Sequence, residues 1–436
     1  MILYPITCFH RGGKRTRNAV TPEKKEGSEI MNVAILGFGV VGSGVAEVIT
    51  KNSESILKNS DVSLSLKKIL DIRDFENNPY EALMTKDFEE IVNDDSIQIV
   101  VETMGGVNPA FDFAMRCLNK GKHVVSSNKE LVATKGFELL EAARKNNVNF
   151  LFEASVGGGI PIIRPISRCL AGNRISEIAG ILNGTSNFIL TKMIVEGMSF
   201  SDALSLAQQL GYAEKDPTAD VEGLDAMRKI CILASLAFGN HVYPDGVYCE
   251  GISKITLSDV SYAESADCVI KLLARTKKLE NDKILVMVTP CLISKESMLA
   301  GVNDVFNACL VRGDATGDVL MYGKGAGKLA TASAVVGDVI DCAANDEKRK
   351  FFGWDAAKEN CLASHLEAET AVYVRAEKTD RALIDSTFGE VKYLQYEGCD
   401  ENEIAFITGI AKEAEITGKL EKAGIKVLSL IRVADY

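Results

Sequence analysis

The chain has 436 residues, a net charge of −11, 47% hydrophobic residues and 25% charged residues. This length predicts two or three domains, and the composition is ordinary for a globular protein. The acidic balance argues against nucleic-acid binding, and no apolar run reaches membrane-spanning length. The eleven cysteines include no Cys-x-x-Cys pair, which favours a reduced, cytoplasmic protein.

The first thirty residues differ from the rest of the chain. Arg11-Gly-Gly-Lys-Arg-Thr-Arg17 is basic, and the polar segment after it is rich in turn formers. We therefore expect residues 1–30 to be a disordered extension, with Met31 as an alternative start. The ordered fold is expected to begin at Met31.

Residues 31–155 predict a dinucleotide-binding domain. The apolar run Val33–Leu36 leads into a glycine loop and a helix expected over residues 41–58. The glycines permit a tight turn and close backbone approach to a pyrophosphate at the helix N-terminus. Strands and helices alternate from there to residue 152, which indicates a Rossmann-type, doubly wound parallel sheet. The candidate cofactor residues of the loop are Gly37, Phe38, Gly39, Val40, Val41 and Gly42.

The end of the second predicted strand, 66–70, bears on the choice of cofactor. An acid at this place binds a ribose 2′-hydroxyl and favours NAD, whereas an arginine accommodates the 2′-phosphate of NADP. The chain has both, Asp71 and Arg73. The cofactor is therefore NADP or NAD, with NADP slightly favoured through Arg73.

Residues 156–344 predict an α/β substrate and dimerisation domain with an open sheet. Strands are expected at 175–182, 284–288 and 303–311, and helices at 186–196, 200–210 and 220–238. Residues 320–344 contain a glycine turn and a helix that we expect to pack back on the first domain.

A charged linker, 345–364, precedes the last predicted domain, 365–436. Its pattern is strand, helix, strand, strand, helix, strand within about 70 residues, which is typical of a ferredoxin-like fold. The predicted strands are 370–375, 391–396, 403–408 and 426–431, and the predicted helices are 379–388 and 412–423.

The segment 207–229 carries the strongest chemical signal. Asp225 and Lys229 lie one helical turn apart and precede the apolar run 230–238, so their helix is expected to be buried on all sides. Buried charges are usually paired or used in function. From spacing alone, a catalytic pair and an ordinary i,i+4 surface pair carry about equal weight.

This segment resembles the signature of homoserine dehydrogenase over its whole length. Further matching motifs are Gly37–Gly42, Asn128-Lys129-Glu130, 153–161, Asn183-Gly-Thr185 and 325–336, where Leu329 replaces a common proline. The resemblance implies NAD(P)-dependent oxidation of L-homoserine to L-aspartate 4-semialdehyde, or the reverse. Such hydride transfer needs a group that exchanges the hydroxyl proton, and a buried lysine of lowered pKa can do so.

The resemblance also assigns candidate roles residue by residue. The catalytic candidates are Lys229, Lys129 and Asp225. The substrate-binding candidates are Glu214, Asp220, Asp225, Gly184 and Thr185. The cofactor candidates outside the glycine loop are Arg73, Thr103, Ser126, Lys129 and Gly327. A monovalent cation, sodium or potassium, is implied at Glu153, Val156, Gly158 and Ile160, mainly through main-chain oxygens; from the residues alone, a plain strand-to-helix turn is the stronger interpretation.

The last predicted domain resembles the ACT regulatory module, which in this family implies a threonine effector. The family's Asp-x-Pro-Gly turn is missing, and Glu377–Asp380 stands in its place. The domain is therefore interpreted as a threonine sensor or as a support for oligomerisation. The family implies a homodimer or homotetramer.

Three other functions fit the sequence less well. Another two-domain NAD(P) oxidoreductase is disfavoured by the full agreement over 211–229, and aspartate-semialdehyde dehydrogenase by the lack of a cysteine in a nucleophile context. A non-catalytic NAD(P) sensor would be free to lose Lys129, Asp225 and Lys229. No fusion to aspartate kinase is expected, because only a short segment precedes Met31.

Overall fold

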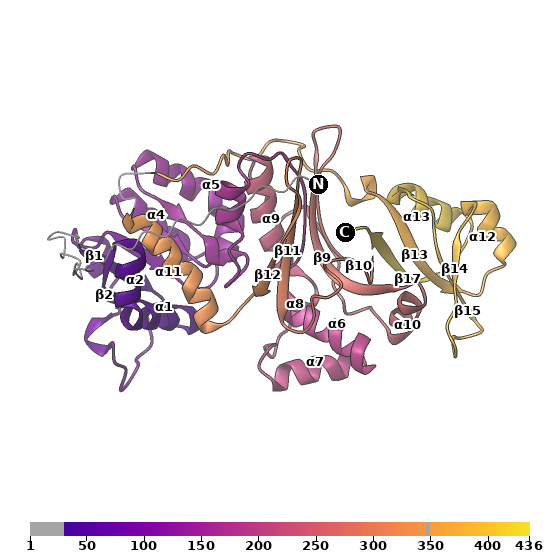
Figure 1. Ribbon diagram of the computed structural model, residues 1–436, viewed down its shortest axis with the longest axis horizontal. Coiled ribbons are helices and arrows are strands. Elements are labelled where there is room, and N and C mark those ends of the chain that lie inside the picture. The colour runs from indigo at the N-terminus through magenta and orange to yellow at the C-terminus, as the bar shows by residue number, and fades with distance from the viewer. Residues whose placement is uncertain (1–29, 345–348) are drawn as a thin grey trace, which may run out of the picture.

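The computed structural model describes residues 30–344 and 349–436. The predicted disordered extension therefore lies outside the described residues except for Ile30, and so does the start of the predicted linker. Figure 1 shows two units built on separate sheets, with a smaller C-terminal unit that continues the second sheet. Within the described residues, no helix combines the length and apolar character needed to cross a membrane.

The first unit is a six-stranded parallel sheet in the order β3-β2-β1-β4-β5-β6. Its strands are β1 (Ile30–Leu36), β2 (Ser63–Leu70), β3 (Met84–Thr85), β4 (Ile99–Glu102), β5 (His123–Ser126) and β6 (Phe150–Leu151). The order reverses direction beside β1, which is where such sheets bind nucleotides. The doubly wound parallel sheet predicted from the sequence is confirmed.

Helices cover both faces of this sheet. They are α1 (Val40–Lys51), α2 (Ser53–Ser60), α3 (Glu89–Val92), α4 (Ala110–Asn119), α5 (Lys129–Lys145) and the returning α11 (Lys328–Ala344). Val45 of α1 and Val335 of α11 pack in one buried cluster with Val33 and Ile35 of β1. The prediction of a single helix over 41–58 is wrong in one detail, because Asn52 leaves the helical conformation and separates α1 from α2.

The second sheet has eleven strands among the described residues and is mostly antiparallel. Its central order is β12-β11-β7-β9-β10. These strands are β7 (Ile175–Ile181), β9 (Cys268–Lys278), β10 (Ile284–Ser294), β11 (Phe306–Gly313) and β12 (Gly317–Lys324), with the short β8 (Tyr248–Cys249) beside β10. The sequence pattern missed β9 and β12. β9 is buried through its centre and therefore shows no alternation, and β12 carries the glycine-rich stretch that was interpreted as a turn.

The helices of the second unit are α6 (Gly184–Glu196), α7 (Phe200–Gln209), α8 (Thr218–Val221), α9 (Leu224–Phe238) and α10 (Leu257–Ser265). α9 packs against α5 of the first unit as well as β9 and β10 of the second sheet. Its residues 230–236 are all at most 7% exposed, which confirms a helix buried on all sides. The helix predicted over 220–238 divides at Gly223, whose φ of +79° and close neighbours on β10 and β8 exclude a side chain.

The C-terminal unit consists of β13 (Glu369–Glu377), α12 (Arg381–Phe388), β14 (Lys392–Leu394), β15 (Glu403–Ile407), β16 (Ala411–Lys412), α13 (Glu413–Lys422) and β17 (Val427–Ala434). The elements predicted there are all present within a few residues. However, its sheet is not separate from the second sheet. β17 pairs in parallel with the end of β10 at residues 291–293, so the two sheets are continuous.

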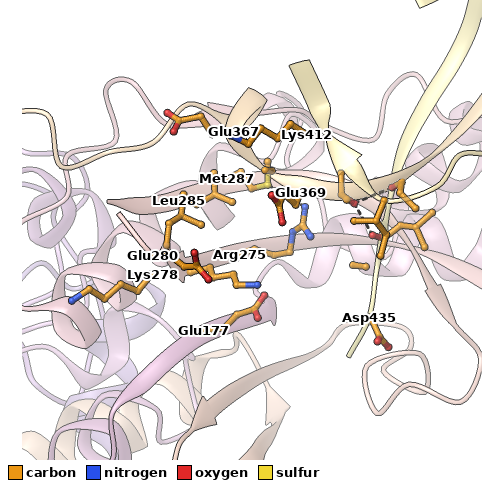
Figure 2. A pocket seen from close by; sticks show the side chains of 18 of the residues that line it. Glu177, Arg275, Lys278, Glu280, Leu285, Met287, Glu367, Glu369, Lys412 and Asp435 are labelled. Atoms are coloured by element: carbon orange, nitrogen blue, oxygen red, sulfur yellow. Dashed lines mark hydrogen bonds between the residues drawn. The ribbon is translucent and has the colours of Figure 1, made fainter. Parts of the chain in front are cut away.

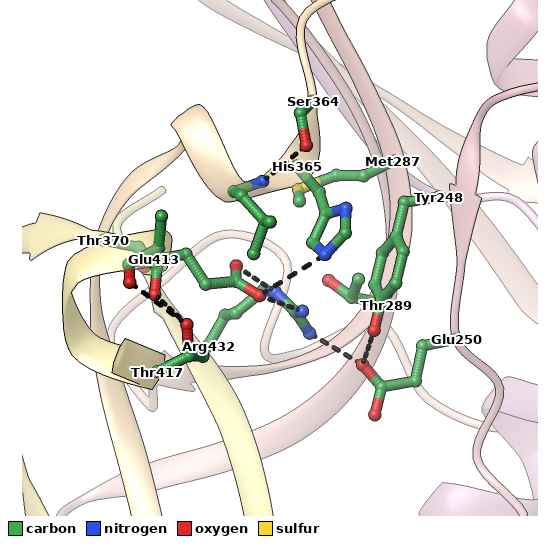
Figure 3. A network of polar contacts seen from close by, with 12 residues as sticks. Tyr248, Glu250, Met287, Thr289, Ser364, His365, Thr370, Glu413, Thr417 and Arg432 are labelled. Carbon is green, nitrogen blue, oxygen red and sulfur yellow. Dashed lines mark hydrogen bonds and ion pairs between the residues drawn. The ribbon is translucent and has the colours of Figure 1, made fainter. Parts of the chain in front are cut away.

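A buried charge network fastens this unit to the second sheet (Figure 3). Arg432 of β17 donates to both carboxylate oxygens of Glu413 on α13, at 2.8 and 2.6 Å, and to Glu250 beside β8 at 2.7 Å. His365 stacks on the ring of Tyr248, and its Nε2 lies 4.0 Å from Glu413. The Arg432 and Glu413 side chains are only 2% and 3% exposed. Burying these charges is costly, so their mutual pairing is essential to this contact.

We predict that Arg432→Met destabilises the C-terminal unit by about 3 kcal/mol, because it leaves the Glu413 carboxylate buried without its counter-ion. Hydrogen exchange of the β17 amides measures this effect. The matched control is Lys419→Ala, which breaks an exposed pair with Glu415 and should cost less than about 1 kcal/mol. Equal losses in the two variants would contradict the role assigned to the network.

Candidate active site

The glycine loop lies at the carboxyl end of β1 and requires glycine at two positions. Gly37 has a φ of +91°, and a Cβ on Gly42 would lie 1.9 Å from the carbonyl oxygen of Gly37. Gly39 differs, because a Cβ there would meet no atom within 4 Å. Val40 begins α1 and is 67% exposed, so the open space beside Gly39 lies at a helix N-terminus. This cradle fits a dinucleotide phosphate.

Asp71 and Arg73 occupy the adjoining end of β2. One oxygen of Asp71 accepts from the main-chain N–H of Phe38 at 2.7 Å, and Arg73 donates to both oxygens from Nε and Nη2 at 3.0 and 2.9 Å. The Arg73 guanidinium holds the pKa of Asp71 down at about 2. Arg73 itself is 58% exposed and lies over the ring of Phe75. Asp71 thus fastens the glycine loop, while Arg73 remains accessible to a ligand.

The ends of β4 and β5 contribute Thr103 and Ser126. The Thr103 hydroxyl donates to the carbonyl oxygen of Gly37 at 2.8 Å, which connects it to the glycine loop. Ser126 donates at 2.5 Å to Glu102, a residue that is 0% exposed. Sequence reasoning missed Glu102, although an acid that ends a wholly apolar strand is a recognisable signal.

The two sheets meet at a cluster of charges around Asp225 on α9. Lys229 Nζ donates to Asp225 Oδ2 at 2.8 Å and to the carbonyl oxygen of Leu182 at 2.7 Å. Lys129 Nζ, from the first residue of α5, lies 2.5 Å from Asp225 Oδ1. The three residues predicted to be catalytic are therefore brought together, and one carboxylate is shared by lysines from both units.

Burial and ion pairing shift the pKa values of Lys229 and Asp225 in opposite directions. Burial lowers the pKa of Lys229, and the neighbouring Asp225 partly opposes that shift. Burial alone would raise the pKa of Asp225, but the charges of Lys229 and Lys129 outweigh it, so the net shift is downward. Asp225 therefore stays a carboxylate, and Lys229 is the group whose proton is made easier to lose.

Asn183 links this cluster to Asp220. Its Nδ2 donates to Asp220 Oδ1 at 2.7 Å and to Asp225 Oδ2 at 2.9 Å, while its Oδ1 caps α6 by accepting from the N–H of Ser186. Burial raises the pKa of Asp220. Asn183 belongs to a motif that matches the family but was assigned no role from the sequence; its place before Gly184 and Thr185 is the signal that could have assigned one.

The remaining substrate candidates lie around the start of α6. Gly184 is the first residue of the helix, and a Cβ there would lie 2.8 Å from the carbonyl oxygen of Val305. Thr185 donates to the carbonyl oxygen of Tyr212 at 2.7 Å, which holds the loop after α7 against α6. Glu214 lies exposed on that loop.

The segment 153–160 crosses from the first unit to the second. The Glu153 carboxylate is 3% exposed and accepts from the main-chain amides of residues 162–164 at 2.6 to 2.8 Å. Its side chain is thus committed to capping the turn that follows. A cation here would depend on main-chain carbonyls, including those of Val156, Gly158 and Ile160. Among the described residues, no group of three or more His, Cys, Asp or Glu side chains could hold a metal ion.

The same segment contacts the return crossing at residues 325–330. A Cβ on Gly158 would lie 2.3 Å from the carbonyl oxygen of Gly325, and a Cβ on Gly159 would lie 2.9 Å from Cβ of Ala330. Gly327, a cofactor candidate, has a φ of +128° and immediately precedes α11. The two crossings between the units are therefore packed backbone against backbone.

Comparisons with known proteins agree on one family. Residues 37–153 match the model described as homoserine dehydrogenase, NAD binding domain, and residues 161–340 match the model described as homoserine dehydrogenase. A homoserine dehydrogenase of Synechocystis is 47% identical over 71% of this chain and 73% of its own. The crystal structure of a homoserine dehydrogenase from Thiobacillus denitrificans is 36% identical, with a TM-score of 0.85 over 93% of this chain and 99% of its own. A hyperthermophilic archaeal homoserine dehydrogenase in complex with NADPH is 29% identical, with a TM-score of 0.63 over 74% of this chain and all of its own.

We predict that Arg73→Ala raises the Kd of NADPH roughly tenfold, because a hydrogen bond to a charged group is worth about 1.5 kcal/mol or more. The Kd of NADH should stay level or fall, since Asp71 is released to accept a ribose hydroxyl. Fluorescence titration with both nucleotides measures the two constants. Equal changes for NADPH and NADH would show that Arg73 does not face the 2′ position.

Proposed function

The chain belongs to the homoserine dehydrogenase family, and from that premise we propose how its residues carry out the reaction. The enzyme interconverts L-homoserine and L-aspartate 4-semialdehyde with a nicotinamide cofactor, as part of the route from aspartate to threonine and methionine. The observation that carries the proposal is the single carboxylate of Asp225 between Lys229 and Lys129.

Lys229 is proposed as the acid and base of the reaction. As an ammonium it gives a proton to the aldehyde oxygen during reduction, and as an amine it takes the hydroxyl proton of homoserine during oxidation. Its burial supports this role, because a lowered pKa brings the two forms closer in population near neutral pH. The carbonyl oxygen of Leu182 and the carboxylate of Asp225 fix the direction in which Nζ points.

Lys129 and Asp225 are proposed to orient the reacting groups. Asp225 keeps its charge beside two lysines, so it can hold both ammonium groups and accept a hydrogen bond from the substrate hydroxyl. Lys129 is partly exposed and comes from the other unit, so it can reach substrate and cofactor together. The arrangement preorganises charge before the substrate arrives.

The substrate is proposed to lie between α6, α8 and α9. Its ammonium requires an acid, and Asp220 and Glu214 are the candidates. Gly184 and Thr185 begin α6, where main-chain N–H groups favour the substrate carboxylate.

The cofactor is proposed to be NADP or NAD, with NADP favoured, and it supplies the hydride. Gly37 to Gly42 would hold the pyrophosphate, and Arg73 the 2′-phosphate. Thr103, Ser126, Lys129 and Gly327 would surround the nicotinamide half. The open space beside Gly39 and the exposed guanidinium of Arg73 support this placement.

A sodium or potassium ion is proposed at the crossing between the units. The ligands would be main-chain oxygens of Glu153, Val156, Gly158 and Ile160. Carbonyl oxygens suit a hard cation, and the buried carboxylate of Glu153 supplies negative charge nearby.

Threonine is proposed as an effector that binds between the second sheet and the C-terminal unit. A cavity of about 730 Å³ there is lined by β9, β10, β13 and β17 (Figure 2). Five basic and five acidic side chains line it, among them Arg275 and Glu369, and this balance suits a zwitterion. Figure 2 shows the guanidinium of Arg275 pointing toward Glu369 and Met287. Because the family's Asp-x-Pro-Gly turn is missing from this chain, we propose this cavity as the place to test for threonine binding.

The working form is proposed to be a cytoplasmic homodimer or homotetramer. The family resemblance supports assembly through the open sheet. The ten cysteines of the described residues are free thiols, which suits a reducing compartment.

We predict that the purified protein consumes NADPH faster than NADH with L-aspartate 4-semialdehyde. Replacing sodium and potassium by tetramethylammonium should lower the rate. Added threonine should lower the rate of the wild type more than that of Arg275→Met. Mass photometry of the same sample reports the subunit number. A lack of turnover with both nucleotides in the presence of sodium or potassium would instead favour another substrate or a non-catalytic sensor.

We predict that Lys229→Ala loses at least roughly a hundredfold in kcat, within the range of general acid–base catalysis. NADPH should still bind, because Lys229 does not line the glycine loop. Steady-state rates and fluorescence titration separate the two effects. Weakened NADPH binding with near-normal turnover would overturn the role given to Lys229.

A further inference from the structure

Glu102 is a buried acid to which the proposed reaction gives no role. It is the last residue of β4 and lies between Leu36 of β1 and Ser126 of β5 in the sheet register. It is 0% exposed, at the sheet edge that faces the proposed cofactor site. A buried carboxylate is expensive, and a neutral side chain would serve packing alone at lower cost.

Within residues 30–344 and 349–436, the hydrogen bonds of the Glu102 carboxylate are with neutral groups. Oε1 accepts from the main-chain N–H of Met104 at 2.8 Å, and Oε2 accepts from the hydroxyl of Ser126 at 2.5 Å. Burial raises the pKa of Glu102 to about 7, although these hydrogen bonds and one from Asn128 oppose the shift. The acid thus connects two neighbouring loops, 103–106 and 126–129.

A continuous chain of hydrogen bonds leads from Glu102 to Asn128, the N-cap residue of α5 that precedes Lys129. The Ser126 hydroxyl accepts from the main-chain N–H of Asn128 at 3.0 Å. Asn128 caps α5 by accepting from the N–H of Leu131, and its Nδ2 donates to the carbonyl oxygen of Gly106 at 2.6 Å. Lys129 is the first residue of this capped helix, so the direction of its side chain depends on the cap.

We propose that Glu102 is a positioning residue, which holds the loop 103–106 and the start of α5 so that Lys129 meets Asp225. Glu102 acts through Ser126 and Asn128 and does not touch the substrate. The inference rests on the role proposed for Lys129, and it gives a physical reason for a charge at the end of an otherwise apolar strand. An amide cannot replace the carboxylate, since it would present a donor to Ser126 and leave the serine proton without its acceptor.

The test compares Glu102→Gln with wild type. We expect kcat to fall roughly tenfold or more, as for the loss of a hydrogen bond to a charged group, while the Kd of NADPH changes less than about threefold. Amide exchange at Leu131 should become faster, because the cap of α5 is loosened. Ser126→Ala should also speed amide exchange at Leu131, and exchange there should be no faster in the double variant than in Glu102→Gln alone.

Lys122→Met is the matched control. Lys122 is a buried charge at the opposite edge of the same sheet, where its Nζ donates to the carbonyl oxygens of Asp94 and Ile97. It should lower the melting temperature without changing kcat more than about twofold. A similar loss of kcat in Lys122→Met, or a kcat within twofold of wild type in Glu102→Gln, would overturn the inference.

Lys129→Ala distinguishes a failure of the role proposed for Lys129 from a failure of the inference about Glu102. If it retains turnover, the role proposed for Lys129 fails, and with it the inference about Glu102. If it loses turnover while Glu102→Gln does not, only the inference about Glu102 fails.

Discussion

One carboxylate, that of Asp225, is the interaction on which the site depends. Two lysines from different units and the amide of Asn183 all converge on its oxygens. Asp225 and Lys229 are both buried, so neither of these two charges could be tolerated without the other. The shared carboxylate therefore solves a stability problem and a catalytic one together, because the pairing that permits burial also leaves Lys229 with a lowered pKa.

The fold makes this convergence possible by burying α9 completely. The helix lies between α5 and the second sheet, and its residues 230–236 are buried on every side. Only its first turns carry charge, and they emerge where the two units meet. α5 begins at the same place because parallel strands end at one sheet edge, and the loop after β5 delivers Lys129 there. The returning α11 then closes the first unit, and the chain passes once more to the second sheet before β13.

Most of the first unit could be predicted from its sequence, because the alternation of strand and helix is local and the glycine loop has strict spatial needs. The pairing of Asp225 with Lys229 was visible in their spacing, and the burial of their helix in the apolar run that follows, but spacing alone left an ordinary surface pair equally plausible. β9 gave no periodic signal because it is buried through its centre. The continuity of β10 with β17 depends on residues such as Cys291 and Arg432, which are 141 positions apart, and no local pattern encodes it. Asn183 and Glu102 each had a local signal, but Asp220, Asp225 and Ser126, which they contact, are brought near only by the fold.

The contact between Gly158 and Gly325 has a consequence for how this protein can change over evolutionary time. Gly158 faces the backbone of the opposite crossing, because a Cβ there would lie 2.3 Å from the carbonyl oxygen of Gly325, whereas a Cβ on Gly325 would meet the side chain of Asn307 at 2.0 Å. A substitution of Gly158 therefore cannot be accommodated by a smaller side chain on the opposite crossing, because the atoms it would meet there belong to the backbone. Sequence drift at Gly158 has no compensating partner, so it should proceed far more slowly than at Gly325, where a smaller residue in place of Asn307 could make room.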